Sequence, residues 1–125
     1  MTVVGLDHVQ VAAPEGCEAD ARAFYGLLLG LEEIEKPPLL APRGGCWFRA
    51  GAHELHVGVA APFAPAAKAH PALAVGSGDD LDELAARLDA GGVQVAWADP
   101  AELGGRRRFF VLDPWGNRLE VLAPR

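Results

Sequence analysis

Apolar and polar residues alternate with a period of two along most of the chain, a pattern that predicts β-strands. In the first half the strands are expected at residues 3–11, 31–35, 46–50 and 53–59. In the second half they are expected at residues 70–75, 93–98, 106–112 and 118–122. Only the tight turn at residues 51–52 separates two of these runs, which therefore predict a β-hairpin.

Two stretches have the 3.6-residue apolar period of an amphipathic helix. The first covers residues 18–29, ends before Gly30, and has an expected buried stripe of Ala21, Phe24, Tyr25 and Leu28. The second begins with Asp79 or Asp80 as the N-cap and ends at residues 91–92. Its expected buried stripe is Leu81, Leu84, Ala85 and Leu88.

The order of these elements repeats: a strand, a helix and three strands, then a linker at residues 60–69, then the same series again. We therefore predict an α+β fold of two tandem βαβββ units forming curled sheets around a cleft. The units cover about residues 1–59 and 70–125 of a single domain, residues 1–125. Aligning the units pairs His8 with His70 and His56 with Glu120, at offsets of 62 and 64 residues.

Composition narrows the class of protein. The net charge of −6 argues against nucleic acid as the main partner. No apolar run approaches the ~20 residues that cross a bilayer, and no signal peptide is recognised, so we expect no membrane partner and a cytoplasmic location. Two cysteines, Cys17 and Cys46, match neither a disulfide framework nor a zinc motif.

One carboxylate stands out in the last strand, where Glu120 lies between Leu119 and Val121. The breaker residues 113–117 before this strand predict a turn, in which Gly116 and Asn117 can adopt the positive φ that a sharp reversal needs. A buried carboxylate in mid-strand needs a cation, a hydrogen-bond network or water. The alternative is an edge strand whose polar face is wet.

The repeat places four potential metal ligands on equivalent strands: His8, His56, His70 and Glu120. If the units pack with pseudo-twofold symmetry, these side chains converge on one cavity. Three imidazoles and a carboxylate suit a divalent ion such as Zn, Ni, Fe, Mn or Co. The alternative is four unrelated polar strand residues, which chance explains poorly at repeat-equivalent positions.

The chain resembles the vicinal oxygen chelate (VOC) superfamily, over essentially its whole length. This superfamily includes glyoxalase I, extradiol dioxygenases, fosfomycin-resistance thiol transferases and bleomycin-resistance proteins. The matching pieces are residues 6–9 (Leu-Asp-His-Val), residues 24–31 (Phe-Tyr-Gly-Leu-Leu-Leu-Gly-Leu), His70, and residues 113–120 (Asp-Pro-Trp-Gly-Asn-Arg-Leu-Glu).

The resemblance implies metal ligands at His8, His70 and Glu120, leaving coordination positions open for a bidentate substrate. Glyoxalase I has its proton-transfer glutamate where this chain has His56, and Glu54, on the same strand face, could substitute for it. His56 is either a fourth ligand or a general base. The candidate catalytic residues are therefore Glu120, His56 and Glu54.

We also assign Gln10, Trp47 and Arg118 as candidate substrate-binding residues, because Gln10 shares the His8 face and Trp47 can line an apolar pocket. The basic run at residues 106–108 is interpreted as a solvated loop, or alternatively as an attractor of anionic groups. Arg118 lies two residues before Glu120 in the last strand.

These observations predict a metal-dependent lyase, isomerase or dioxygenase that acts on a small molecule with vicinal oxygens. The alternative is a bleomycin-resistance-type protein that sequesters a small molecule without turnover, although such members lack the metal residues. A third possibility is a metal site that only stabilises the fold. The resemblance also implies a homodimer, sometimes formed by exchanging units through the linker at residues 60–69.

Overall fold

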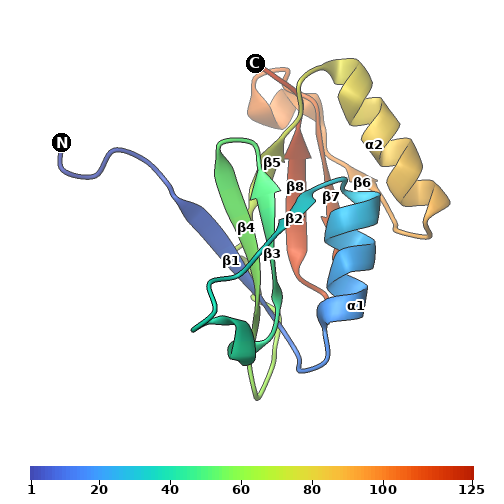
Figure 1. The fold of residues 1–125 in the computed structure, drawn as a ribbon. Coiled ribbons are helices and arrows are strands. Elements are labelled where there is room, and N and C mark those ends of the chain that lie inside the picture. Colours follow the sequence, from blue (N-terminus) through green and yellow to red (C-terminus); the bar gives the residue numbers. More distant parts are fainter. The chain divides into compact units, whose positions relative to one another are not determined.

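The computed structural model describes residues 1–125 and divides the chain into two units, Met1–Pro65 and Ala66–Arg125. The N-terminal unit contains a four-stranded sheet of order β1-β4-β3-β2, and the C-terminal unit one of order β5-β8-β7-β6. In each sheet the first strand pairs in parallel with the last, and the other pairs are antiparallel. The predicted α+β fold of two βαβββ units is confirmed (Figure 1).

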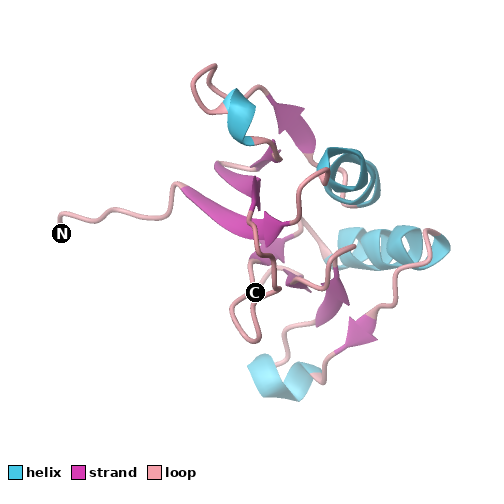
Figure 2. Ribbon diagram, turned by 90° about the horizontal axis from the view of Figure 1, so that it is seen from below, coloured by secondary structure: helices cyan, strands magenta, loops and turns pink.

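The N-terminal unit contains β1 (His8–Ala13), α1 (Glu18–Ala21), a π-helix η1 (Arg22–Leu28), β2 (Glu32–Ile34), a 3₁₀-helix η2 (Ala41–Arg43), β3 (Cys46–Ala50) and β4 (His53–Val59). The C-terminal unit contains β5 (Ala72–Ala74), α2 (Gly78–Ala90), β6 (Ala96–Trp97), a 3₁₀-helix η3 (Pro100–Leu103), β7 (Arg108–Leu112) and β8 (Arg118–Leu122). Each unit thus has one longer helical segment and one short 3₁₀-helix among its strands (Figure 2).

The register of the sheets repeats along with the order of their elements. Gln10 lies opposite His56 in the first sheet, and Ala72 lies opposite Glu120 in the second. These two pairs are related by the offsets of 62 and 64 residues that the sequence alignment predicts. Equivalent strands of the two units therefore present equivalent positions.

The first strand begins at His8, so the prediction that it begins at residue 3 is wrong. Its partner β4 begins at His53, directly after the turn at residues 51–52. Because β4 does not extend further, the chain before Asp7 has no neighbouring strand with which to pair. The segment before β1 leads away from that strand (Figure 1). Four further strands, β2, β5, β6 and β7, also begin later than predicted, at Glu32, Ala72, Ala96 and Arg108.

The second helix has the expected buried stripe, and all four predicted residues are buried in it. Its N-cap is Ser77 instead of either aspartate, because the Ser77 Oγ accepts a hydrogen bond from the backbone N–H of Asp80 at 3.0 Å. None of the helices combines the length and the apolar character that a bilayer-spanning segment requires.

The first helix widens into a π-helix after one α-helical turn. The N–H of Leu29 bonds to the carbonyl of Phe24, five residues earlier, at 2.9 Å. The wider turn shifts the phase of the buried face by one residue. Leu29 is buried in place of the predicted Leu28, while Ala21, Phe24 and Tyr25 are buried as predicted.

The turn before β8 is built around the buried side chain of Asp113. Its Oδ1 accepts the backbone N–H groups of Trp115 at 3.0 Å and Asn117 at 2.8 Å, and its Oδ2 accepts the Asn117 amide at 2.8 Å. Gly116 has the predicted positive φ, at 94°, whereas Asn117 does not have one. This network holds the start of the strand that carries Glu120.

Replacing Asp113 with alanine is expected to lower the free energy of unfolding by about 3 kcal/mol, because it leaves buried donors without an acceptor. Chemical denaturation of the variant and the wild type measures the difference. A loss within ~0.5 kcal/mol, the range of a surface substitution, would show that the network does not stabilise the turn.

Candidate functional site

One face of the N-terminal sheet carries five of the predicted site residues. Across the strands, His8 lies opposite Glu54, and both Gln10 and Trp47 lie opposite His56. Residues directly opposite each other point to the same side of a sheet, so these five side chains share a face. The alternating residues Leu55, Val57 and Phe48 are buried on the other face. The predicted assignment of faces in β4 is thus confirmed.

The imidazole of His56 is stacked between two other rings. Its centroid lies 3.7 Å from that of Trp47, with the planes 3° apart, and 4.2 Å from that of His8, with the planes 18° apart. Only 4% of the His56 surface is exposed, and its Nε2 lies 2.8 Å from the Oε1 of Glu54. His56 therefore belongs to a packed group with Glu54, and this nitrogen already has a partner.

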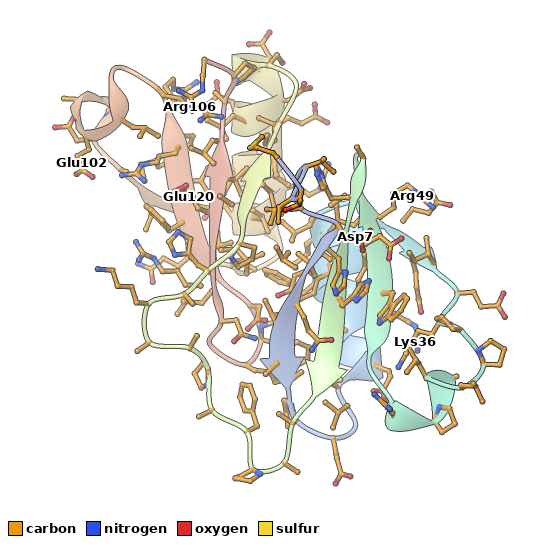
Figure 3. All side chains as sticks on the ribbon, turned by 90° about the vertical axis from the view of Figure 1, so that its left-hand side faces the viewer. Asp7, Lys36, Arg49, Glu102, Arg106 and Glu120 are labelled. Carbon is orange, nitrogen blue, oxygen red and sulfur yellow. The ribbon has the colours of Figure 1, made fainter.

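His8 and His70 both have their Nδ1 atoms engaged. The Nδ1 of His70 lies 2.9 Å from the carbonyl oxygen of Lys68, which can only accept, so Nδ1 carries the proton. The Nδ1 of His8 lies 2.8 Å from the carboxylate of Asp7, which is labelled in Figure 3. Each arrangement places the lone pair on Nε2, the arrangement that metal-ligating histidines commonly have.

Glu120 has an arginine partner inside the C-terminal unit. The Nη1 of Arg108 donates to the Oε1 of Glu120 at 2.6 Å, and the Nη2 donates to Glu102 at 3.1 Å. The Nε2 of His70 lies 3.9 Å from the same Oε1. Arg108 is thus the cation that a buried mid-strand carboxylate needs. Figure 3 labels Glu120, which lies on β8, and Glu102, which lies on η3.

Arg118 belongs to the same unit and lies over an aromatic ring. Its guanidinium carbon is 3.9 Å from the centroid of Phe110, the residue opposite Glu120 in the sheet. Arg118 takes part in none of the salt bridges of the structure. Its positive charge is therefore not paired with a carboxylate of this structure.

Sequence reasoning missed the role of Arg108. The solvated-loop interpretation of residues 106–108 holds for Arg107, which is exposed outside any strand, but it is wrong for Arg108, which lies in β7 and pairs with Glu120. Arg106 Nε donates to the carbonyl oxygen of Ala123 at 2.6 Å, Arg107 Nη2 donates to Asp82 at 2.6 Å, and Arg108 Nη1 donates to Glu120 at 2.6 Å. The alternation of β7 carried the signal, because Arg108 shares a face with Phe110, which lies opposite Glu120.

The predicted metal ligands fall into two pairs, one in each unit: His8 and His56 in the first, and His70 and Glu120 in the second. Neither unit alone gathers three His, Cys, Asp or Glu side chains around a point where an ion could bind. Convergence of the four residues therefore stays a prediction. The donor chemistry fits a divalent ion, since His8 and His70 offer Nε2 atoms and Glu120 offers a carboxylate.

The two cysteines are not suited to nucleophilic chemistry. Burial and the neighbouring Glu18 raise the pKa of the Cys17 thiol to about 11, and burial also raises the pKa of Cys46. Both thiols are buried and form no disulfide.

We therefore expect iodoacetamide at pH 8 to label the folded protein much more slowly than the chain unfolded in guanidinium, as mass spectrometry would measure. The raised pKa also predicts a loss of stability at high pH. Between about pH 9 and 11 the unfolded chain releases a proton that folded Cys17 keeps, so the free energy of unfolding falls as the pH rises. Equal labelling rates in the two states would contradict the burial of the thiols.

Comparisons with known proteins agree on one family. The model of the Glyoxalase/Bleomycin resistance protein/Dioxygenase superfamily matches residues 5–121. A solved structure described as a glyoxalase family protein, from Bacillus anthracis, is 49% identical with a TM-score of 0.90, and the match covers 98% of this chain and 97% of that one. No functionally curated protein gives a significant match.

Two more distant structures share the fold. Lactoylglutathione lyase from Agrobacterium tumefaciens is 21% identical with a TM-score of 0.75, and the match covers 98% of this chain and 96% of that one. FosX, a fosfomycin resistance protein from Listeria monocytogenes, is 20% identical with a TM-score of 0.75, with 98% and 95% covered. Proteins with this one fold therefore carry names that denote different activities.

Proposed function

Because the chain belongs to the Glyoxalase/Bleomycin resistance protein/Dioxygenase superfamily, we propose that it is a metal-dependent enzyme acting on a small substrate with vicinal oxygens. The reaction class is that of a lyase, isomerase or dioxygenase that works by electrophilic activation. The substrate binds through two adjacent oxygens, and residues of this chain orient it and accept its proton.

The ion would be held by His8, His70 and Glu120, and it would be a divalent ion such as Zn, Ni, Fe, Mn or Co. When bound, such an ion would polarise the substrate oxygens and would stabilise the negative charge that develops on them. Two histidines and one carboxylate leave coordination positions for the substrate.

The observation that carries this proposal is the state of the two histidines. His70 donates its Nδ1 proton to the Lys68 carbonyl oxygen, and His8 pairs its Nδ1 with Asp7. Both rings are therefore oriented with Nε2 available, as ligation requires.

Glu54 and His56 are suited to moving a proton and to supporting His8. The Nε2 of His56 faces the Glu54 carboxylate at 2.8 Å, and the ring stacks on His8. We assign His56 a positioning and proton-transfer role instead of a ligand role, because its Nε2 pairs with Glu54 and its ring is packed between those of Trp47 and His8. Gln10 and Trp47, on the same sheet face, would contact the substrate.

A second candidate function is the sequestration of a small molecule without turnover. One observation favours it, the pairing of Arg108 with Glu120. In this pair the negative charge of Glu120, a proposed metal-binding residue, is neutralised without a metal ion. Arg118, on the face of Phe110, would then bind an anionic group of the ligand.

The two functions are separated by assaying purified protein on diols, catechols, epoxides and 2-oxo-aldehydes, with and without a divalent ion. The enzyme proposal predicts turnover of at least one of these classes and its loss when a chelator removes the ion. Turnover that survives the chelator would contradict metal dependence. Ligand binding without any turnover across the panel would favour sequestration.

We also propose a homodimer. Val3 and Val4 in the segment before β1 have exposed fractions of 75% and 94%, and Leu6 has 73%. A twofold partner would cover apolar surface of this kind. Sedimentation equilibrium at micromolar concentration is expected to give twice the chain mass of 13.1 kDa, and a monomer there would contradict the prediction.

A further inference from the structure

One oxygen of Glu120 has two neighbours that bear on the proposed metal site. Arg108 Nη1 donates to Oε1 at 2.6 Å, and His70 Nε2 lies 3.9 Å from the same atom. An ion bound between His70 and Glu120 would be coordinated by Oε1, the same oxygen that accepts the hydrogen bond from the Arg108 guanidinium. If Arg108 bonded the other oxygen instead, it would only orient the carboxylate. The observed contact places two cations in competition for one acceptor.

The hydrogen bonding of Arg108 is incomplete, and this favours a rearrangement in which Arg108 gives up its hydrogen bond to Glu120. Its Nη2 donates to Glu102 at 3.1 Å, but its buried Nε has no hydrogen-bond partner. A buried donor without a partner costs free energy that a shift toward water would recover. Glu102 is 60% exposed, so it offers Arg108 a second anchor at the solvent side.

We propose that Arg108 is an internal counter-ion that competes with the metal for Glu120 and thereby sets the metal affinity of the site. Without an ion, Arg108 neutralises the buried carboxylate. When an ion binds, Arg108 leans toward Glu102 and gives up Oε1. The inference rests on the proposed function, because Glu120 and His70 are the ligands proposed there.

Charge decides the direction of the effect. A guanidinium beside a ligand carboxylate repels a divalent ion, and this repulsion between partly buried charges is only weakly screened. Removing the positive charge at position 108 should therefore tighten metal binding. A group that only orients a ligand behaves in the opposite way, because its removal weakens binding, typically by about 10–100-fold.

The test is a titration of Zn²⁺ into the full-length protein in competition with a chromophoric chelator. Arg108→Gln is expected to lower the Zn²⁺ dissociation constant by about tenfold or more, on the scale of known effects of residues around metal ligands. Arg107→Gln is the matched control, because it makes the same charge change at an arginine that pairs with exposed Asp82 and leaves Glu120 alone. Its dissociation constant should stay that of the wild type.

A second variant moves the affinity in the other direction and protects the test against a folding defect. Glu102→Gln removes the outer anchor, so Arg108 should hold Glu120 more firmly and Zn²⁺ should bind several-fold more weakly than to the wild type. Glu102 is on the surface, so this variant is expected to fold. In the absence of metal, the melting temperature of Arg108→Gln should be lower than that of the wild type, because buried Glu120 loses its cationic partner.

Opposite shifts for Arg108→Gln and Glu102→Gln would support the inference. Wild-type binding with unchanged or weaker binding by Arg108→Gln would overturn it and leave the proposed function standing. Binding by Arg108→Gln but not by the wild type would support the inference and contradict the proposed function. Absence of binding in both proteins would overturn both.

Discussion

Glu120→Gln is expected to lower the affinity for the divalent ion by at least ~100-fold, because it removes the only carboxylate among the proposed ligands. The amide keeps the shape of the side chain and can still accept from Arg108, so the strand should remain folded. Competition with a chromophoric chelator measures the affinity, and circular dichroism checks the fold. Activity on any substrate found in the panel should fall in parallel.

Glu83→Gln is the matched control for this variant, because it makes the same chemical change at an exposed position of α2. Its metal affinity should equal that of the wild type. If Glu120→Gln bound the ion as tightly as Glu83→Gln, the carboxylate would not be a ligand, and its strand position would be explained by the pair with Arg108 alone.

His56→Gln is expected to reduce turnover by about 100-fold or more while the ion stays bound, with its affinity lowered by about tenfold. Turnover falls because the pair with Glu54 is lost, and affinity falls because His8 loses the ring on which it stacks. Metal titration and steady-state kinetics on the same preparation separate the two effects.

His53→Gln, at the exposed start of β4, serves as the control for His56→Gln and should change neither quantity. A loss of metal as complete as that of Glu120→Gln would make His56 a fourth ligand, contrary to the role assigned here. Unchanged turnover and unchanged affinity would remove His56 from the site altogether.

The parts of the fold that follow local rules could be predicted from the sequence. The strands β3, β4 and β8 have the predicted limits, and α2 buries its predicted stripe, because a period of two or 3.6 is a direct consequence of backbone geometry. The limits of β1 and β6 could not be predicted, because each strand extends only as far as the neighbouring strand with which it pairs, β4 and β7 respectively. The π-helix was also missed, because its residues have no distinctive pattern.

For the candidate site, alternation predicted which residues share a face, and the repeat predicted which positions are equivalent. His8, Gln10, Glu54 and His56 meet on one sheet face for this reason. The partner of Glu120 is Arg108, which lies in another strand. Predicting this pair requires the register of β7 against β8 as well as the pattern within one strand. The stacking of Trp47 on His56 likewise depends on the register between β3 and β4.

The metal content of the protein tests the central claim most directly. Elemental analysis of protein purified without added metals, beside a His8→Ala variant prepared in the same way, should show close to one divalent ion per site in the wild type and none in the variant. Equal occupancy in the two proteins, or no ion in the wild type even after incubation with Zn, Ni, Fe, Mn and Co, would contradict the assignment of a metal-dependent enzyme.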